Sequence, residues 1–319
     1  MMKKAWMIAA LALILLGIGV FVAALAVNDW DFSRLGTGSY ETATAEITEE
    51  FDSIAISVDT ADVSIRRSED GQCRLVTRAE RDTEHTATVK DGVLCIEFSD
   101  ERSFLRRLLQ FSFGSPSVTL YLPDDAYAAL TVETATGDTD IPRGFSFGSI
   151  EAKGSTGDFS SGASVSGLLK VTLSTGRATV TGCSVGALQL ETSTGSIRLS
   201  EVACSGAVSI QVNTGDIELS DVAALTLTAS ADTGDVALRR VRIGGQLSVT
   251  TDTGEVSLTS SDAETVHIRT TTGDVTGSFL SDKIVYASSD TGKVDVPHLT
   301  SGGICEITTD TGRIRITIE

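Results

Sequence analysis

Apolar residues alternate with polar ones in short runs that meet at a Thr-Gly dipeptide. Before the dipeptide, apolar or small residues stand two, four and six positions back from the threonine, as Val212, Ile210 and Val208 do. After it they stand three and five positions beyond the threonine, as Ile217 and Leu219 do. A period of two predicts strands with one buried face. The change of parity predicts one inserted residue between two strands, and glycine suits that place because it adopts backbone angles closed to other residues.

The dipeptide recurs ten times at intervals of 19 or 20 residues. Self-similarity at a fixed period is the signature of stacked supersecondary units. The threonine has the inward parity of the strand that it ends, so its β-branched side chain is expected to point inward. The glycines expected to form the corners are Gly137, Gly157, Gly176, Gly195, Gly215, Gly234, Gly254, Gly273, Gly292 and Gly312.

The repeat predicts an all-β fold, a parallel β-solenoid (single-stranded β-helix) of about ten coils of 19–20 residues over residues 124–319. Each coil reads as a strand, a corner, a second strand and a looser return loop. Equivalent strands of successive coils should pair in parallel about 4.8 Å apart, which gives a rod on the order of 45–50 Å long. A propeller blade needs about 40 residues, and separate hairpins would show two turn signals in each unit.

The residues ahead of the array predict a first coil and a cap. The run IAISVDTADVSI, residues 54–65, has the pattern of a coil in which Ala61 replaces the glycine. Charged, strand-like runs follow, with a hairpin turn at Lys90–Gly92. We interpret residues 51–123 as this coil and an N-terminal cap that covers the first open coil. Residues 28–50, rich in Thr, Ser, Gly and Glu, are expected to form a flexible tether.

The N-terminus predicts export. Lys3 and Lys4 precede an uncharged run at residues 5–27, which is long enough at about 1.5 Å per residue to span a hydrocarbon core of roughly 30 Å. The positive-inside rule places residues 1–4 in the cytoplasm and the C-terminal domain outside it. Ala24–Ala26 also matches the pattern that signal peptidase cuts, so the run reads as a single-pass transmembrane helix or as a signal peptide. Either reading exports the large domain.

Composition narrows the classes of partner. Hydrophobic residues make up 41% of the 319-residue chain, which is ample for a core, whereas aromatic residues make up 5%, which argues against an aromatic-lined cleft. The net charge of −18 argues against nucleic acid as a partner. The five cysteines show no metal-ligand spacing and read as small buried hydrophobes. Cys73 with Cys95 is the one disulfide considered, because the segment between them reads as a hairpin.

A column of acids beside the corners is the first candidate site. Stacking brings equivalent residues to roughly 5 Å, where like charges repel unless a cation such as Ca²⁺ screens them. Basic residues such as Arg177 and Arg313 interrupt the column, and Asp is also an ordinary turn residue. We favour solvated turn acids and predict no cofactor, with calcium as the alternative. The column would comprise Asp216, Asp232, Asp235, Asp252, Glu255 and Asp274.

Two further features bear on function. Residues 100–113 place leucines and phenylalanines at helical spacing with arginines between them, which predicts a short helix that plugs the solenoid or one that rests on an anionic membrane surface. Catalysis on a polysaccharide would need convergent acids and bases. The array offers His267 and His298, no Trp and no recognised catalytic motif. We therefore predict that the protein is not an enzyme.

The run FDSIAISVDTADVSI, the motif VTLYLP and the TGD-type strands that follow them resemble a bacterial β-strand-repeat family of unknown function, labelled "putative adhesin" and including LiaG-like membrane proteins. The resemblance covers nearly everything after residue 50. It implies a membrane-anchored β-solenoid on the outside of bacteria, sometimes linked to envelope stress, and it supplies no catalytic residues.

The function expected from these observations is a non-catalytic binding or adhesion module of the bacterial cell membrane, with an unidentified envelope polymer or protein as its ligand. A self-assembling scaffold is the alternative, because the chain ends at RIRITIE without a cap. Ile314, Ile316 and Ile318 would then lie on an open coil and invite a second copy. A polysaccharide-active enzyme is a third, less favoured reading.

Overall fold

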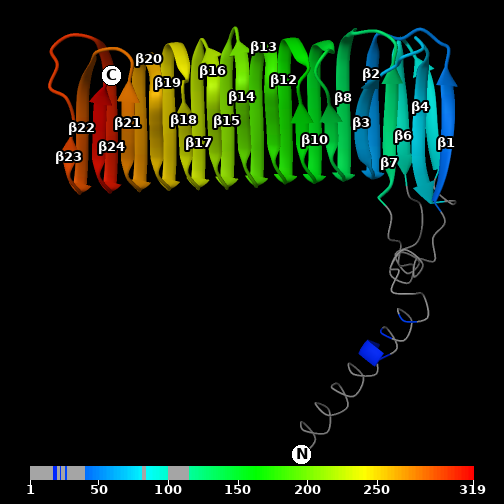
Figure 1. Ribbon diagram of the computed structural model, residues 1–319, viewed down its shortest axis with the longest axis horizontal. Helices are drawn as coiled ribbons and strands as arrows, with labels where there is room; N and C mark the ends of the chain where they lie inside the picture. The colour runs from blue at the N-terminus through cyan, green and yellow to red at the C-terminus, as the bar shows by residue number, and fades with distance from the viewer. Residues whose placement is uncertain (1–16, 20–21, 23–25, 27–39, 81–83, 100–114) are drawn as a thin grey trace, which may run out of the picture.

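In the computed structural model the coils stack into one straight rod (Figure 1). The structure describes residues 17–19, 22, 26, 40–80, 84–99 and 115–319. No helix among these residues combines the length and the apolar character that a membrane crossing requires. The anchor predicted at residues 5–27 lies mostly outside the described residues.

Two long parallel ladders run along the rod. From residue 126 onward, the first ladder, face A, contains the strands that lead to the Thr-Gly corners, and the second, face B, contains those that follow them; strands nearer the N-terminus extend both ladders. Face A is built from β2 (Ser53–Thr60), β6 (Val93–Ser99), β8 (Ala126–Thr136), β10 (Ser146–Thr156), β12 (Ser164–Thr175), β15 (Ala207–Thr214), β17 (Thr226–Thr233), β19 (Arg242–Thr253), β22 (Lys283–Thr291), β24 (Gly303–Thr311) and the second halves of β13 (Ala178–Thr194) and β20 (Val256–Thr272). Face B is built from β3 (Asp62–Arg67), β7 (Ser117–Leu122), β9 (Thr139–Ile141), β11 (Phe159–Ser161), β14 (Ile197–Cys204), β16 (Ile217–Ala224), β18 (Val236–Arg239), β21 (Val275–Phe279), β23 (Val294–Asp295), β25 (Ile314–Ile318) and the first halves of β13 and β20.

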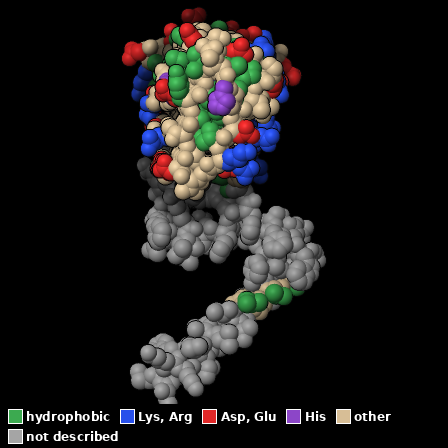
Figure 2. All heavy atoms as spheres, turned by 90° about the vertical axis from the view of Figure 1, so that its left-hand side faces the viewer, with side chains coloured by type: hydrophobic (Ala, Val, Ile, Leu, Met, Phe, Trp, Pro, Cys, Tyr) green, Lys and Arg blue, Asp and Glu red, His purple; other side chains and the backbone are tan. Residues whose placement is uncertain are grey.

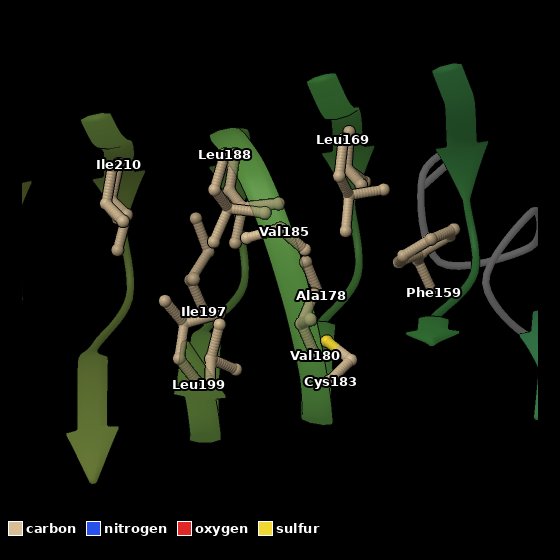
Figure 3. Close-up of a cluster of buried hydrophobic side chains, with 14 of the residues drawn as sticks. Phe159, Leu169, Ala178, Val180, Cys183, Val185, Leu188, Ile197, Leu199 and Ile210 are labelled. Atoms are coloured by element: carbon tan, nitrogen blue, oxygen red, sulfur yellow. The ribbon is translucent and has the colours of Figure 1, made fainter. Parts of the chain in front are cut away.

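A third, short face C closes each coil between the end of one face B strand and the next face A strand. The ladder there is also parallel, with Val185 beside Cys204 and Ala203 beside Ala223. One coil shows how the core is filled: its inward residues are Ile197 and Leu199 on face B, Val202 and Cys204 on face C, and Val208, Ile210 and Val212 on face A, all of them buried. Figure 3 shows side chains of this kind converging on the interior from several strands. The parallel β-solenoid predicted from the parity of the sequence is confirmed.

The corner glycine fits where other residues do not, for two reasons. Gly215 has a φ of 137°, which L-residues avoid. A Cβ on Gly215 would also lie 2.0 Å from the carbonyl oxygen of Gly195 in the neighbouring coil. The contact recurs along the column, because Gly254, whose φ is not left-handed, would place a Cβ 1.9 Å from the Gly234 oxygen. Close stacking of the corners therefore selects glycine even where the backbone angle does not.

The predicted orientation of the threonines was wrong. All ten corner threonines are exposed, because the chain has already left the core when it reaches them. The inward column of face A ends two residues earlier. Thr192, Thr251 and Thr270 occupy that earlier position, are buried, and donate their hydroxyls to the carbonyl of a corner glycine in a neighbouring coil at 3.3 Å.

At the N-terminal end of the rod, the order of the strands in space differs from their order in the sequence. The predicted first coil exists, with Ala61 at its corner, but it lies inside the rod: β2 is flanked by β6 and β8, and β3 by β7 and β9. Antiparallel strands close the outer side, where β4 (Cys73–Glu80) pairs with β7 and β5 (Glu84–Lys90) forms the predicted hairpin with β6. Residues 40–47, within the run predicted as a tether, form β1 (Tyr40–Ile47) against β4.

At the C-terminal end, too, the order of the coils in space differs from their order in the sequence. The prediction that the last coil is open was therefore wrong. β24 pairs with β20 on one side and with β22 on the other, so the last coil in sequence lies between the two before it. β25 likewise pairs with β21, and with β23 at Ile314 and Arg315. Ile314 and Ile316 are buried and Ile318 is half-buried. The outermost coil is β22 with β23, at the left in Figure 1.

Candidate functional site

The acids beside the Thr-Gly corners form a ladder with backbone amides. The amide of Asp235 donates to Asp216 Oδ1 at 2.9 Å, and the amide of Glu255 donates to Asp235 Oδ1 at 2.8 Å. Asp274 Oδ1 accepts from the amide of Arg313 at 2.7 Å, in the coil that lies next to it in space. Each carboxylate thereby satisfies a corner amide of the next coil.

The other members of the predicted column do not join the ladder. Asp232 and Asp252 precede the corner and are exposed. Within the described ranges no group of three or more His, Cys, Asp or Glu side chains is placed to hold a metal ion. The role that the geometry gives to Asp216, Asp235 and Asp274 is to cap backbone amides.

A second corner, between faces B and C, is left-handed as well, and in four successive coils its residue is not glycine. Glu201, Asp221, Arg240 and Ser260 have φ between 48° and 56° and occupy equivalent positions in successive coils. Arg240 bonds both carboxylate oxygens of Asp221 at 2.6 Å, and this guanidinium lowers the pKa of Asp221. Arg143 reaches along the same corner to Glu201 at 3.5 Å. Charged side chains therefore line this edge of face C.

A third corner, between faces C and A, carries a glycine column that the sequence interpretation missed. Gly148, Gly167, Gly186 and Gly206 follow one another at intervals of 19, 19 and 20 residues. A Cβ on Gly186 would lie 2.3 Å from the carbonyl oxygen of Ser166. The spacing was visible in the sequence, but no constant neighbour such as threonine marked it. Leu225 interrupts the column and is 57% exposed.

Between these two corners, face C is hollowed into a groove of about 880 Å³. At one outward position of face C, six successive coils carry Ala or Ser: Ala126, Ser146, Ser164, Ser184, Ala203 and Ala223. Small side chains leave the space that larger ones would fill. The next two coils carry Arg242 and Asp262 in the same place, so the uncharged strip ends there.

The floor of the groove is apolar. It consists of the inward residues of face C, beginning with Tyr127 and Phe147, whose rings stack at 6.0 Å between centroids, and ending with Cys204 and Ala224. Burial raises the pKa of Tyr127 to about 12 and also raises the pKa of the Cys204 thiol. Both groups therefore stay protonated at neutral pH. The groove presents hydroxyls, methyls and backbone over a neutral apolar floor.

The two candidate histidines do not line the groove. His267 Nδ1 lies 3.1 Å from Glu306 Oε2 on the outside of face A, and His298 is exposed in the loop after β23. All five cysteines are unpaired, and Cys73 is not joined to Cys95. The segment predicted as a plug or membrane contact, residues 100–113, lies outside the described residues.

Comparison with known proteins finds a matching family model and solved structures of similar fold. The family model described as Toastrack DUF4097 matches residues 51–209 and 206–319. A "putative adhesin" from Parabacteroides merdae is 14% identical with a TM-score of 0.51, over 88% of this chain and 98% of that chain. A "putative lipid binding protein" from Parabacteroides distasonis is 15% identical with a TM-score of 0.49, over 88% of this chain and 98% of that chain. Among curated proteins, no relative is found.

Proposed function

Because the chain belongs to the Toastrack DUF4097 family and carries a long uncharged groove on one face, we propose that it is a non-catalytic binding module of the bacterial cell envelope. The resemblance inferred from the sequence and the family match agree on a β-solenoid of a family without an assigned function. The groove supplies what the family does not, a place where a ligand could lie.

The observation that carries the proposal is the run of six successive coils whose outward residue on face C is Ala or Ser. The chain has a net charge of −18, so a strip along the rod with no charged side chain is a distinct surface. Five steps of about 4.8 Å make the strip roughly 24 Å long. A straight groove of that length suits an extended ligand, and its serine hydroxyls with alanine methyls suit an uncharged one. We therefore propose an extended, uncharged segment of an envelope polysaccharide as the ligand.

The location in the envelope rests on the N-terminal sequence. Residues 5–27, flanked by Lys3 and Lys4, have the length and charge asymmetry of a single-pass anchor with the rod outside the cytoplasm. The strands that follow this run, β1 to β7, form one end of the rod (Figure 1). The proposal is that the rod projects from the membrane by this end. The groove would then face the polymers that surround the cell.

Filling the groove tests the proposal. Ser184 lies in the middle of the strip and is exposed, so Ser184→Arg places a long charged side chain in the path of the ligand. Thr228→Arg is the matched control, because Thr228 is exposed on face A in a strand that is paired on both sides. We expect the wild-type chain and the control to sediment with isolated envelope polysaccharide, and the groove variant to lose at least 90% of that binding, or about 1.4 kcal/mol.

Three results would contradict parts of the proposal. Equal binding by Ser184→Arg and the wild-type chain would remove the groove as the binding surface. Binding that survives enzymatic removal of the polysaccharide but not of protein would make the ligand a protein. Cleavage of the polysaccharide during the assay would overturn the non-catalytic assignment.

A further inference from the structure

The C-terminal end of the rod carries an unprotected strand edge. Within residues 115–319, β22 pairs with β24 on one side and with no strand on the other. From Ile284 to Ser289 the strand has no charged residue, no proline and no register shift. The one basic residue at its start, Lys283, is buried against Asp262 at 2.6 Å and offers no charge to an approaching strand. In natural proteins, exposed charges, prolines or bulges normally protect an edge strand from pairing.

The layer of side chains beneath this strand is also incompletely covered. Val285, Ala287 and Val296 pack against the core but remain half-buried. Among the described residues beyond the N-terminal run, six large hydrophobic side chains are exposed, and four of them fall in the last coils: Leu280, Tyr286, Val294 and Ile304, with Tyr286 the most exposed at 62%. Figure 2 views this end directly and shows hydrophobic side chains near its centre with charged ones at the rim.

None of the strands that the structure describes pairs with the free edge of β22. Eleven strand-to-strand steps of about 4.8 Å separate β6 from β22, or about 53 Å. Ser99 and Ser115 both belong to the opposite end, and the 15 residues between them, running out and back, could span at most roughly 25 Å. The run before Tyr40 carries the proposed membrane anchor. A strand that pairs with β22 would therefore have to come from another molecule.

We propose that β22 pairs antiparallel with β22 of a second copy, so that two rods join tip to tip. An open edge offers backbone donors and acceptors that only another strand can match in full. A two-fold axis perpendicular to face A brings inward positions opposite inward positions, so the half-covered layers of the two copies close on each other. The uncharged run from Ile284 to Ser289 places no like charges in opposition. Because the contact is isologous, it stops at a dimer.

Pairing with the other end of a second copy is the less suitable arrangement. That end is finished by β1 and β5, which run antiparallel to the strands beside them and carry charged residues such as Glu41, Glu46 and Lys90. A charged edge is a poor partner for β22. Such head-to-tail contacts would moreover leave a free edge at each end and grow without limit.

The test is sedimentation of the full chain in detergent micelles over a dilution series. One strand pair is a small interface, so we expect a monomer–dimer equilibrium with a dissociation constant in the micromolar range, on the order of 1–50 μM. Tyr286→Lys adds a charge to the exposed edge and should weaken dimerisation at least tenfold. Thr228→Lys adds the same charge to the same face in mid-rod and should leave it unchanged. A short bismaleimide should join Ser288→Cys chains into covalent dimers, but not Thr228→Cys chains or the unmodified chain.

Each other outcome overturns the proposal. A protein that stays monomeric at about 100 μM, well above the expected dissociation constant, has no such contact. A dimer that persists in Tyr286→Lys is held together elsewhere, for instance by the membrane run. Growth beyond the dimer with rising concentration would show head-to-tail stacking instead.

Discussion

Substituting one corner glycine should be among the most damaging single changes in this rod. In Gly215→Ala the new methyl meets the carbonyl oxygen of Gly195 at 2.0 Å, far inside any allowed contact, and the backbone φ of 137° is unfavourable for alanine. The coils must separate locally to relieve the contact. Two inter-coil hydrogen bonds flank the site, from Gly195 N–H to Thr214 O at 2.8 Å and from Ile197 N–H to Asp216 O at 2.9 Å.

The magnitude follows from these two costs. A left-handed or related backbone angle costs a non-glycine residue about 1–2 kcal/mol. Weakening two buried backbone hydrogen bonds costs about 1 kcal/mol each, and more if a donor is left unpaired. We therefore expect Gly215→Ala to lower the free energy of unfolding by about 3–5 kcal/mol, at the upper end of single substitutions.

Substitutions at two other glycines separate the cost of the backbone angle from the cost of the close contact. Gly71 has a φ of 73° but nothing within 4 Å of the methyl group that alanine would add, so Gly71→Ala carries the backbone cost alone, about 1–2 kcal/mol. Gly254 has no left-handed φ but would place its methyl 1.9 Å from the Gly234 oxygen, so Gly254→Ala carries the contact cost alone, about 2–3 kcal/mol. The expected order of damage is Gly215, then Gly254, then Gly71.

Urea denaturation of the full chain, followed by far-ultraviolet circular dichroism, measures these differences. Solenoids need not unfold in one step, because each coil contacts only its neighbours. The comparison should therefore use the midpoint of the transition as well as the fitted free energy. If Gly254→Ala unfolds with the wild-type chain, close stacking of the corners is not what selects glycine, and the account of the corner is wrong.

Three further predictions concern single side chains. Asp216→Ala should lower the free energy of unfolding by about 1 kcal/mol through loss of the amide cap, whereas Asp232→Ala, exposed at the same corner, should change it by less than about 0.5 kcal/mol; urea denaturation checks both. Burial raises the pKa of Cys305 to about 12 from 9.0. Between these two values the thiol loses its proton only in the unfolded chain, so the free energy of unfolding is unaffected below pH 9 and falls as the pH rises toward 12. Melting temperatures below pH 9 and at about pH 10.5 check this. Asp262→Asn leaves Lys283 buried beside a neutral partner and should cost more than Lys283→Met, by about 1–2 kcal/mol in melting experiments.

The regular part of the fold could be predicted because each coil repeats one local problem. A strand whose buried face changes parity needs an inserted residue. At Gly215 both the backbone angle and the close stacking of the coils require that this residue be glycine. The position of the threonine could not be predicted from parity alone. Parity says which side of the strand Thr194 is on, but not that the core has ended at Thr192, two residues earlier.

The groove was missed for a different reason. Its lining residues, such as Ser184 and Ala203, are common on any β surface, so neither residue attracts attention by its type. The signal lies in the absence of charge at one position of the coil over six successive turns, and that position is recognised only once the third corner at Gly186 and Gly206 is known. The sequence pattern predicted the strands of faces A and B, but face C was interpreted as a loose return loop.

The order of the coils at the two ends has a common physical basis. Chain termini fray when they lie at an edge, because a terminal strand there is held on one side only. In this rod neither end of the repeated sequence lies at an edge. The first coil, β2 with β3, and the last, β24 with β25, are each flanked on both sides, while the outermost strands belong to segments that continue in both directions along the chain. An internal strand at the edge is tethered at both of its ends, so opening it requires two hinges rather than one. The inserted order therefore holds the first and last coils on both sides, and it leaves β22 as an edge that is exposed and yet ordered, as a pairing surface must be.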